Sequence, residues 1–203
     1  MQMRTCLHDK IGWIFDLDGT LTVPVHDFGV IRQELAIPEG EDILGHLGQL
    51  PEELAAPKQR RLDEIERELA GYAVAAPGVL ALLDHLGRCQ SRLGILTRNS
   101  REVALVTLEA IGAHGYFHPD DVLGRAEAPP KPNPSGVVQL CTQWQVAAGQ
   151  VVMVGDYLFD LLAGRSAGAA TVHVARPDGQ RWPAASDVSV ETLDELLLLL
   201  KQT

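Results

Sequence analysis

Short apolar runs alternate with longer stretches of helical periodicity along most of this 203-residue chain. Four of the runs lack the polar–apolar alternation of a half-buried strand, so they predict strands covered on both faces, as in a parallel sheet. These runs are residues 12–15, 92–96, 151–154 and 171–174. Strand–helix alternation of this kind favours an α/β fold with a doubly wound parallel sheet.

The stretches between and after these runs carry helix signals. Pro77 stands at a favourable first-turn position before a row of leucines, and Asn99 with Glu102 resembles a capping arrangement. Asn133 and Pro134 give a second cap and first-turn signal. Two more helices are predicted near the end of the chain, at residues 160–166 and 193–200.

The stretch from residue 23 to residue 76 breaks the alternation, and no convincing strand is evident in it. Its apolar residues mark three helices, around residues 28–35, 43–47 and 62–69. The charged run at 59–68 predicts a solvent-exposed helix face with i,i+4 ion pairs. We therefore expect a small helical domain at 23–76 inserted into an α/β core formed by residues 1–22 and 77–203.

Composition narrows the possible partners. The chain has 17 Lys and Arg against 27 Asp and Glu, a net charge of −10, so nucleic acid and anionic membranes are disfavoured. Cys6, Cys89 and Cys141 lack metal-binding spacing and indicate reduced thiols. The first residues contain no apolar signal region, and the longest apolar run is too short to span a bilayer. These features predict a soluble cytoplasmic protein without a membrane partner.

Two carboxylates, Asp16 and Asp18, directly follow the first predicted strand. Ligands of open α/β sheets bind at the carboxyl ends of the strands, and Gly19 allows a sharp turn there. One carboxylate can attack a phosphorus atom while the other transfers a proton. The alternative for this motif alone is an Asp-Gly turn with solvated acids.

Asp156 follows the strand predicted at 151–154, and Asp160 lies four residues further on. With Asp16, they supply the hard oxygen ligands that Mg²⁺ requires. A metal would also offset the repulsion between three acids and a phosphate group. The alternative is that Asp156 caps a helix and Asp160 lies on the surface.

Thr97, Arg98 and Asn99 follow the strand predicted at 92–96. A hydroxyl and free N–H groups at a helix N-terminus predict a phosphate cradle. Lys131 lies in a loop with prolines on both sides, which restrict the backbone and can hold its ammonium in place. The alternatives are a simple helix cap at Thr97 or Asn99 and an ordinary surface lysine.

Four segments together resemble the ordered motifs of the haloacid dehalogenase-like (HAD) hydrolase superfamily: DLDGTLT at 16–22, ILTRN at 95–99, KPNP at 131–134 and GDYLFD at 155–160. The helical insertion between the first two motifs resembles the branch that includes phosphoglycolate phosphatases and β-phosphoglucomutases. The resemblance implies a Rossmann-like core, a Mg²⁺ cofactor and hydrolysis of a small organic phosphomonoester through an aspartyl-phosphate.

The resemblance also implies roles for the acids. Asp16 would be the nucleophile and a metal ligand. Asp18 would be the general acid and then the base, with its backbone carbonyl also on the metal. Asp156 would bind Mg²⁺, and Asp160 would support it directly or through another ligand. Because the dehalogenases of the superfamily lack the second Asp, Asp18 favours phosphate over halide chemistry.

For the phosphoryl oxygens, the resemblance implies contacts from Thr97 and the N–H of Arg98, with Asn99 alongside. Lys131 would neutralise charge between nucleophile and phosphate. Tyr157 departs from the family pattern, which commonly has a small residue there. The short insertion implies a reduced cap and a more open cleft.

The substrate beyond its phosphate is not determined by these motifs. Arg60 and Arg61 fit a surface helix face better than a substrate site, and His26 and His46 fit hinge or surface positions. We expect a small phosphorylated metabolite as substrate, and a monomer or weak homodimer. The alternatives are a phosphomutase of the β-phosphoglucomutase type and a catalytically silent binding protein on the same fold.

Overall fold

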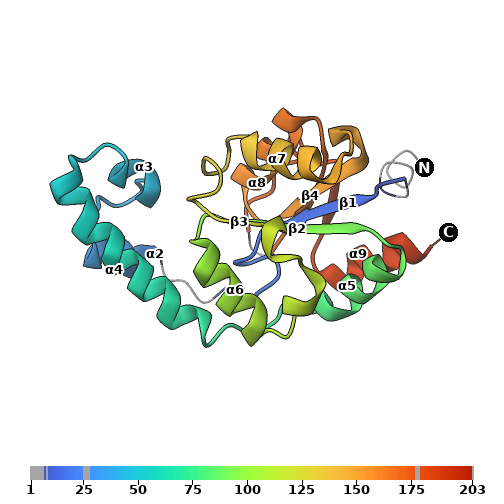
Figure 1. Cartoon of the computed structure of the whole chain (residues 1–203), viewed down its shortest axis with the longest axis horizontal. Coiled ribbons are helices and arrows are strands. Elements are labelled where there is room, and N and C mark those ends of the chain that lie inside the picture. Colours follow the sequence, from blue (N-terminus) through green and yellow to red (C-terminus); the bar gives the residue numbers. More distant parts are fainter. Residues whose placement is uncertain (1–6, 8, 25–27, 177–178, 203) are drawn as a thin grey trace.

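The computed structural model describes residues 7, 9–24, 28–176 and 179–202. It contains a six-stranded parallel sheet in the order β3-β2-β1-β4-β5-β6 (Figure 1). The strands are β1 (Gly12–Phe15), β2 (Arg92–Leu96), β3 (Val122–Leu123), β4 (Val151–Gly155), β5 (Ala170–Val174) and β6 (Val188–Val190). The predicted doubly wound α/β fold is confirmed, and β1 lies in the interior of the sheet.

Helices cover both faces of the sheet (Figure 1). One face carries α5 (Val79–Arg88), α6 (Arg101–Ala110) and α9 (Leu193–Lys201), and the other carries α7 (Ser135–Trp144) and α8 (Leu158–Ala167). Within β1, Trp13 and Phe15 pack with the first group and Ile14 with the second. Both faces of the strand are buried, which explains why the sequence shows an unbroken apolar run instead of alternation.

Three helices form a cap between β1 and β2: α2 (Phe28–Glu34), α3 (Ile43–Leu47) and α4 (Glu52–Ala70). They lie at one end of the molecule, away from the described parts of both chain ends (Figure 1). The cap has its own apolar cluster, which includes Ile31, Leu35, Ile43, Leu62 and Ile65. The long α4 also packs against α6 of the core.

The chain leaves and re-enters the core at neighbouring points. The N–H of Val23 donates to the carbonyl of Val74 at 2.8 Å, and the N–H of Ala76 donates to the carbonyl of Leu21 at 2.9 Å. Thr22 and Ala75 form an antiparallel bridge between these bonds. The two connecting segments are therefore paired with each other where they join cap to core.

Several local predictions are wrong. Pro77 precedes α5, which begins at Val79 after Gly78 in a left-handed conformation with φ of 86°. Ser100 caps α6 by accepting a hydrogen bond from the N–H of Val103, so Asn99 is not its cap. The short strands β3 and β6 were not predicted from the sequence, because runs of two and three residues give little pattern.

Cys89 is exposed and Cys141 is buried, and both are free thiols, while Cys6 lies outside the described residues. Among the described helices, none combines the length and apolar character that crossing a bilayer requires.

Candidate active site

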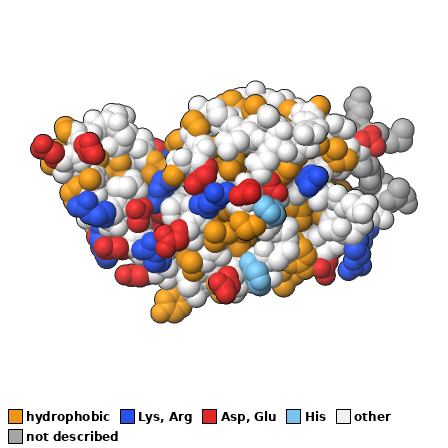
Figure 2. All heavy atoms as spheres, in the orientation of Figure 1, with side chains coloured by type: hydrophobic (Ala, Val, Ile, Leu, Met, Phe, Trp, Pro, Cys, Tyr) orange, Lys and Arg blue, Asp and Glu red, His pale blue; other side chains and the backbone are white. Residues whose placement is uncertain are grey.

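A cleft of about 540 Å³ lies between the carboxyl ends of the central strands and the cap. Asp16 follows β1, Thr97 follows β2 and Asp156 follows β4, and all three line this cleft. Because these three strands are neighbours in the sheet, side chains far apart in the sequence meet at one edge. The space-filling view shows charged side chains of both signs where the cap meets the core (Figure 2).

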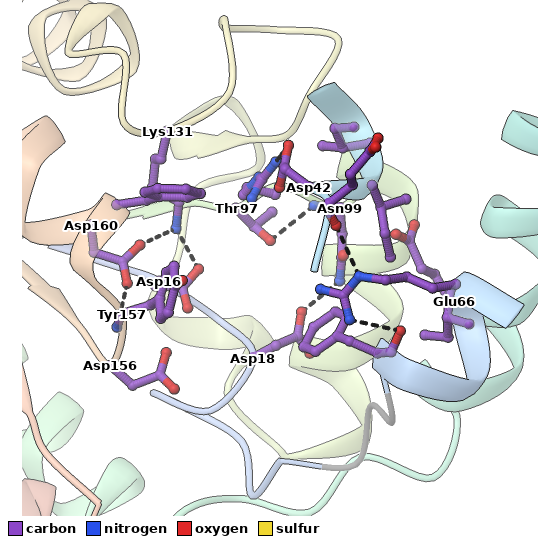
Figure 3. A pocket seen from close by; sticks show the side chains of 18 of the residues that line it. Asp16, Asp18, Asp42, Glu66, Thr97, Asn99, Lys131, Asp156, Tyr157 and Asp160 are labelled. Carbon is purple, nitrogen blue, oxygen red and sulfur yellow. Dashed lines mark hydrogen bonds and ion pairs between the residues drawn. The ribbon is translucent and has the colours of Figure 1, made fainter. Parts of the chain in front are cut away.

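Lys131 is held between two carboxylates at the base of the cleft (Figure 3). Its Nζ lies 2.5 Å from Oδ1 of Asp16 and 2.6 Å from Oδ1 of Asp160, and the residue is only 3% exposed. Burial alone would lower the pKa of Lys131, but the two carboxylates outweigh it and the net shift is upward. The ammonium is therefore a fixed positive charge, and the surface-lysine alternative is wrong.

Three acids converge beside this lysine. Asp16, Asp156 and Asp160 each place a carboxylate oxygen so that the three atoms lie within 4.8 Å of one another. Burial raises the pKa of Asp156 and Asp160; the charge of Asp16 adds to the effect, and Lys131 opposes it. Three hard oxygen donors whose negative charges lie close together fit a Mg²⁺ ion.

Asp160 is not a surface residue. It is 2% exposed, and its Oδ2 accepts a hydrogen bond of 3.0 Å from the N–H of Tyr157 at the start of α8. Its side chain packs so closely over Gly155 that a Cβ at that glycine would collide with it. The glycine before Asp156 thus makes room for the acid that contacts Lys131.

Asp18 lies on the other side of Asp16 and contacts Asn99, whose Nδ2 donates to Asp18 Oδ2 at 2.6 Å (Figure 3). Burial, followed by the nearby charge of Asp16, raises the pKa of Asp18 to about 7. Gly19 has φ of 84°, and a Cβ there would lie 2.6 Å from Oδ2 of Asp156. The turn therefore folds the chain back against the acid cluster, so the alternative of solvated acids is wrong.

The segment after β2 contributes both backbone and side chains. Thr97 is buried, and its Oγ1 accepts a hydrogen bond of 3.2 Å from the N–H of Asn99. Arg98 extends its side chain toward the cap, where Nη2 lies 2.7 Å from Oδ2 of Asp42. Its guanidinium carbon also lies 5.3 Å from the ring centre of Phe159. Arg98 therefore lines the cleft as a link between core and cap.

A second link corrects the interpretation of the charged run at 59–68. Arg125, after β3, forms ion pairs with Asp63 and Glu66 of α4, at 2.8 Å to Glu66 Oε2. Glu66 is 6% exposed and lines the cleft, so this part of the run faces the core and not solvent. Burial raises the pKa of Glu66, and Arg125 opposes that shift.

Arg61 and Arg67 of the run are exposed as predicted, but in place of the predicted i,i+4 pairs Arg61 pairs at i,i+3 and with α2, and Arg67 pairs with Glu102 of α6. Arg61 pairs with Glu34 and Glu64 on the surface, and neither Arg61 nor Arg60 is among the described residues that line the cleft. His46 contacts Glu41, with 2.5 Å between His46 Nδ1 and Glu41 Oε2, while His26 lies outside the described residues.

Residues 32–174 match the family model for haloacid dehalogenase-like hydrolases. The chain belongs to this family. A haloacid dehalogenase-like hydrolase domain-containing protein of Arabidopsis thaliana is 34% identical, over 79% of this chain and 69% of that protein. A phosphoglycolate phosphatase of Chromobacterium violaceum is 26% identical, over 92% of this chain and 95% of the other.

Solved structures agree with the HAD fold. A hydrolase from Pseudomonas syringae superposes with a TM-score of 0.77 at 21% identity, covering 93% of this chain and 97% of that one. A phosphoglycolate phosphatase predicted in Haemophilus somnus superposes with a TM-score of 0.73 at 20% identity, over 95% and 99% of the two chains. These solved structures show the fold, while the family match and the curated relatives confirm the expectation of a HAD-like enzyme of the phosphatase class.

Several residues of this HAD cleft were not identified from the sequence. Arg176, after β5, places Nη2 2.6 Å from Oδ2 of Asp156. Phe159 and Trp182 line the cleft with Tyr157, the one member of the group that the motif comparison had flagged. Phe159 could have been found, since it lies inside the GDYLFD motif, but no local pattern distinguishes Arg176 or Trp182.

Proposed function

We propose that the chain is a Mg²⁺-dependent phosphomonoesterase that forms a phosphoaspartate on Asp16. The observation that carries this proposal is the buried Lys131 ammonium between Asp16 and Asp160. A buried cation at this place offsets the negative charge that an incoming phosphate and its attacking carboxylate bring together.

In the first step, a carboxylate oxygen of Asp16 attacks phosphorus and the bond from phosphorus to the leaving oxygen breaks. Asp18 donates its proton to that oxygen, so the product leaves as an alcohol. A pKa of about 7 suits this role, because the carboxyl is about half protonated at neutral pH and largely protonated below it. Asn99, hydrogen-bonded to Asp18, acts as a positioning residue for the acid.

In the second step, water attacks phosphorus while Asp18, now ionised, accepts its proton. The bond between phosphorus and the Asp16 oxygen breaks, which releases inorganic phosphate and restores both carboxyl groups. The phosphoryl oxygens would be held by the Thr97 hydroxyl, the N–H of Arg98 and the ammonium of Lys131. The Asn99 side chain is assigned to Asp18 instead of to the phosphate.

The carboxylates of Asp16, Asp156 and Asp160, with the backbone carbonyl of Asp18, would hold the Mg²⁺ ion. When bound, the ion supplies charge neutralisation and orients the phosphate. Arg176 already contacts Asp156, so it would share that carboxylate with the ion.

The names of the relatives support a phosphate ester as substrate. They include phosphoglycolate phosphatase and the validoxylamine A 7'-phosphate phosphatase of Streptomyces hygroscopicus, which is 26% identical over 90% of this chain. Because these names describe very different leaving groups, they leave the rest of the substrate open.

The test is phosphate release from a broad panel of phosphomonoesters with and without Mg²⁺, using the wild-type chain and Asp16→Asn. We expect Mg²⁺-dependent release that the substitution abolishes, and an acid-stable, hydroxylamine-sensitive phosphoenzyme in the wild type alone. Activity retained in Asp16→Asn would refute the nucleophile. Isomerisation of a hexose 1-phosphate without phosphate release would identify a mutase, and no turnover in the panel would favour a silent binding protein.

We also propose a small phosphorylated metabolite as partner, a cytoplasmic location and a monomer or weak homodimer. The acidic net charge of −10 supports the exclusion of nucleic acid and anionic membranes.

A further inference from the structure

The outer half of the cleft is the part lined by the cap helices and by Tyr157, Phe159 and Trp182. We infer that it accepts an uncharged leaving group with an apolar or aromatic face, and discriminates against one that carries a carboxylate or a second phosphate. This inference rests on the proposed phosphatase function. Two observations carry the inference: the apolar side chains that line the outer cleft, and the ion pairs formed by the Lys and Arg residues of the cleft.

Apolar side chains make up half of the described residues that line the cap side of the cleft. Its lining includes Phe28, Ile31, Ile43, Leu44 and Leu62, from all three cap helices. A wall of this kind gains free energy when an apolar surface replaces water against it, at roughly 25 cal/mol per Å². Hydrocarbon or ring surface is therefore favoured over a charged group at this end of the substrate.

The core side carries aromatic rings. The ring centre of Tyr157 lies 5.1 Å from that of Phe159 and 5.3 Å from that of Trp182, both in edge-on geometry. Tyr157 is 52% exposed, so part of its ring is open to a ligand. Figure 3 shows it beside the carboxylates of the active site, where it would meet the first atoms beyond the phosphate.

The cations of the cleft are already engaged. Of the described lining residues, four are Lys or Arg, and three of these are in ion pairs: Lys131 with Asp16 and Asp160, Arg98 with Asp42, and Arg176 with Asp156. The fourth, Arg32, donates hydrogen bonds to the carbonyls of Glu41 and Phe28. A second anion on the substrate would compete with these partners for the same cations.

The acids of the outer cleft also disfavour an anionic leaving group. Glu41, Asp42 and Glu66 all line it on the cap side. Because Asp42 is paired with Arg98 and Glu66 with Arg125, a carboxylate on the leaving group would compete with these acids for their partners, whereas a neutral ring would not. Since phosphoglycolate carries a carboxylate, it is disfavoured here despite the names of several relatives.

The experiment compares four alkyl phosphates in the presence of Mg²⁺: benzyl phosphate, 4-carboxybenzyl phosphate, glycerol 3-phosphate and 2-phosphoglycolate. Their leaving groups are all alkoxides, so differences in kcat/KM report recognition more than bond strength. We expect kcat/KM for benzyl phosphate to exceed that for its carboxylated partner by about tenfold or more. Equal or better use of the carboxylated esters would overturn the inference while leaving the phosphatase function intact.

A substitution at Tyr157 tests whether its ring contributes to the preference for benzyl phosphate. Tyr157→Ala should lower the preference for benzyl phosphate over glycerol 3-phosphate by about three- to tenfold, mainly through KM, because one ring contact is lost. Tyr72→Ala is the matched control, since Tyr72 is 81% exposed and is not among the described residues that line the cleft. An unchanged preference in Tyr157→Ala would overturn the aromatic contact. Failure of the wild type to hydrolyse any of the four esters or the wider panel would refute the phosphatase proposal, and this inference with it.

Discussion

The inner and outer halves of the cleft are built from different parts of the chain. The inner half uses strand ends of the sheet, and its charged side chains, Asp16, Lys131 and Asp160, are nearly excluded from solvent. The outer half uses the cap helices, the loop after β5 and half-exposed side chains such as Tyr157. In the inner half, opposite charges compensate one another in a buried cluster, whereas the cap wall of the outer half combines apolar side chains with ion-paired acids.

Under the proposed function, this difference assigns the phosphoryl-transfer reaction to the inner half and the choice of substrate to the outer half. A buried, ion-paired constellation holds its atoms in one geometry, as phosphoryl transfer requires. A wall of apolar side chains on an inserted unit can change without disturbing that geometry. Substitutions in the inner half should therefore lower turnover of every substrate, whereas substitutions in the outer half should change which substrates are preferred.

The largest effect is expected at Asp18. Asp18→Asn should reduce kcat on alkyl phosphates by about 10²- to 10⁴-fold, because the alkoxide loses its proton donor. The loss should be much smaller on p-nitrophenyl phosphate, whose leaving group needs no proton. In the wild type, kcat on alkyl phosphates should fall as pH rises past about 7, because the raised pKa keeps Asp18 protonated only below that value. An equal loss on both substrate types would contradict the acid role.

The next largest effect is expected for substitution of Arg125, which links the cap to the core. Arg125→Met leaves the buried Glu66 without its partner and should lower the free energy of unfolding by about 3 kcal/mol. Arg67→Met is the matched control, because Arg67 also joins α4 to the core, through the exposed Glu102. That pair should contribute less than about 1 kcal/mol. Urea denaturation of both variants measures the difference, and similar losses would argue against a special role for burial.

Magnesium should stabilise the protein in a pH-dependent way. Asp18, Asp156 and Asp160 have raised folded-state pKa values, so between about pH 4 and 7 the folded protein holds protons that the unfolded chain releases. Their contribution to stability is therefore present at low pH and is lost as pH rises. One fixed Mg²⁺ concentration, about 100 times Kd at pH 7.5, should raise Tm by about 5–10 °C near pH 7.5 and by less near pH 5, where protons compete for the carboxylates.

Differential scanning calorimetry with EDTA and with Mg²⁺ checks this expectation. Asp156→Asn is the companion variant, and it should remove most of the Mg²⁺ effect. A Tm shift that is the same at both pH values would show that the ion does not compete with these protons.

The smallest effect is expected for the pair between Arg98 and Asp42, whose side chains are 27% and 41% exposed. Arg98→Met should raise KM by about two- to fivefold, with a smaller change in kcat, because its backbone N–H remains. A double-mutant cycle with Asp42→Asn should give a coupling energy of about 1 kcal/mol or less. A loss of kcat as large as that in Asp18→Asn would show that the Arg98 side chain takes part in the reaction itself and not only in binding the substrate.

The inner half could be predicted because its residues follow recognisable strands. Asp16, Thr97 and Asp156 each come directly after a run buried on both faces, and parallel strands bring their carboxyl ends to one edge. Lys131 is the exception, since it lies in a loop and was predicted from flanking prolines and the motif resemblance. The sequence could not show that Asp160 contacts this lysine, because that contact depends on how α8 packs over Gly155.

The outer half could not be predicted in the same way. Glu66 looks like part of a solvated helix face, but in the structure it is buried and paired with Arg125, 59 residues later. Arg98 and Asp42 are separated by 56 residues and meet only when the cap lies over the sheet edge. Such long-range pairs leave no periodic signal in the chain, so the charged run was interpreted as solvent-exposed.

The paired connecting segments at Val23 and Val74 have a consequence for how such enzymes diversify. Because the chain departs and returns side by side, an inserted unit of another size could be grafted there without reordering the sheet. The cap is in this sense an exchangeable unit attached to the α/β core at one point. Under the proposed function, exchange of this unit alone would change substrate preference, while the residues around Asp16 would stay in place.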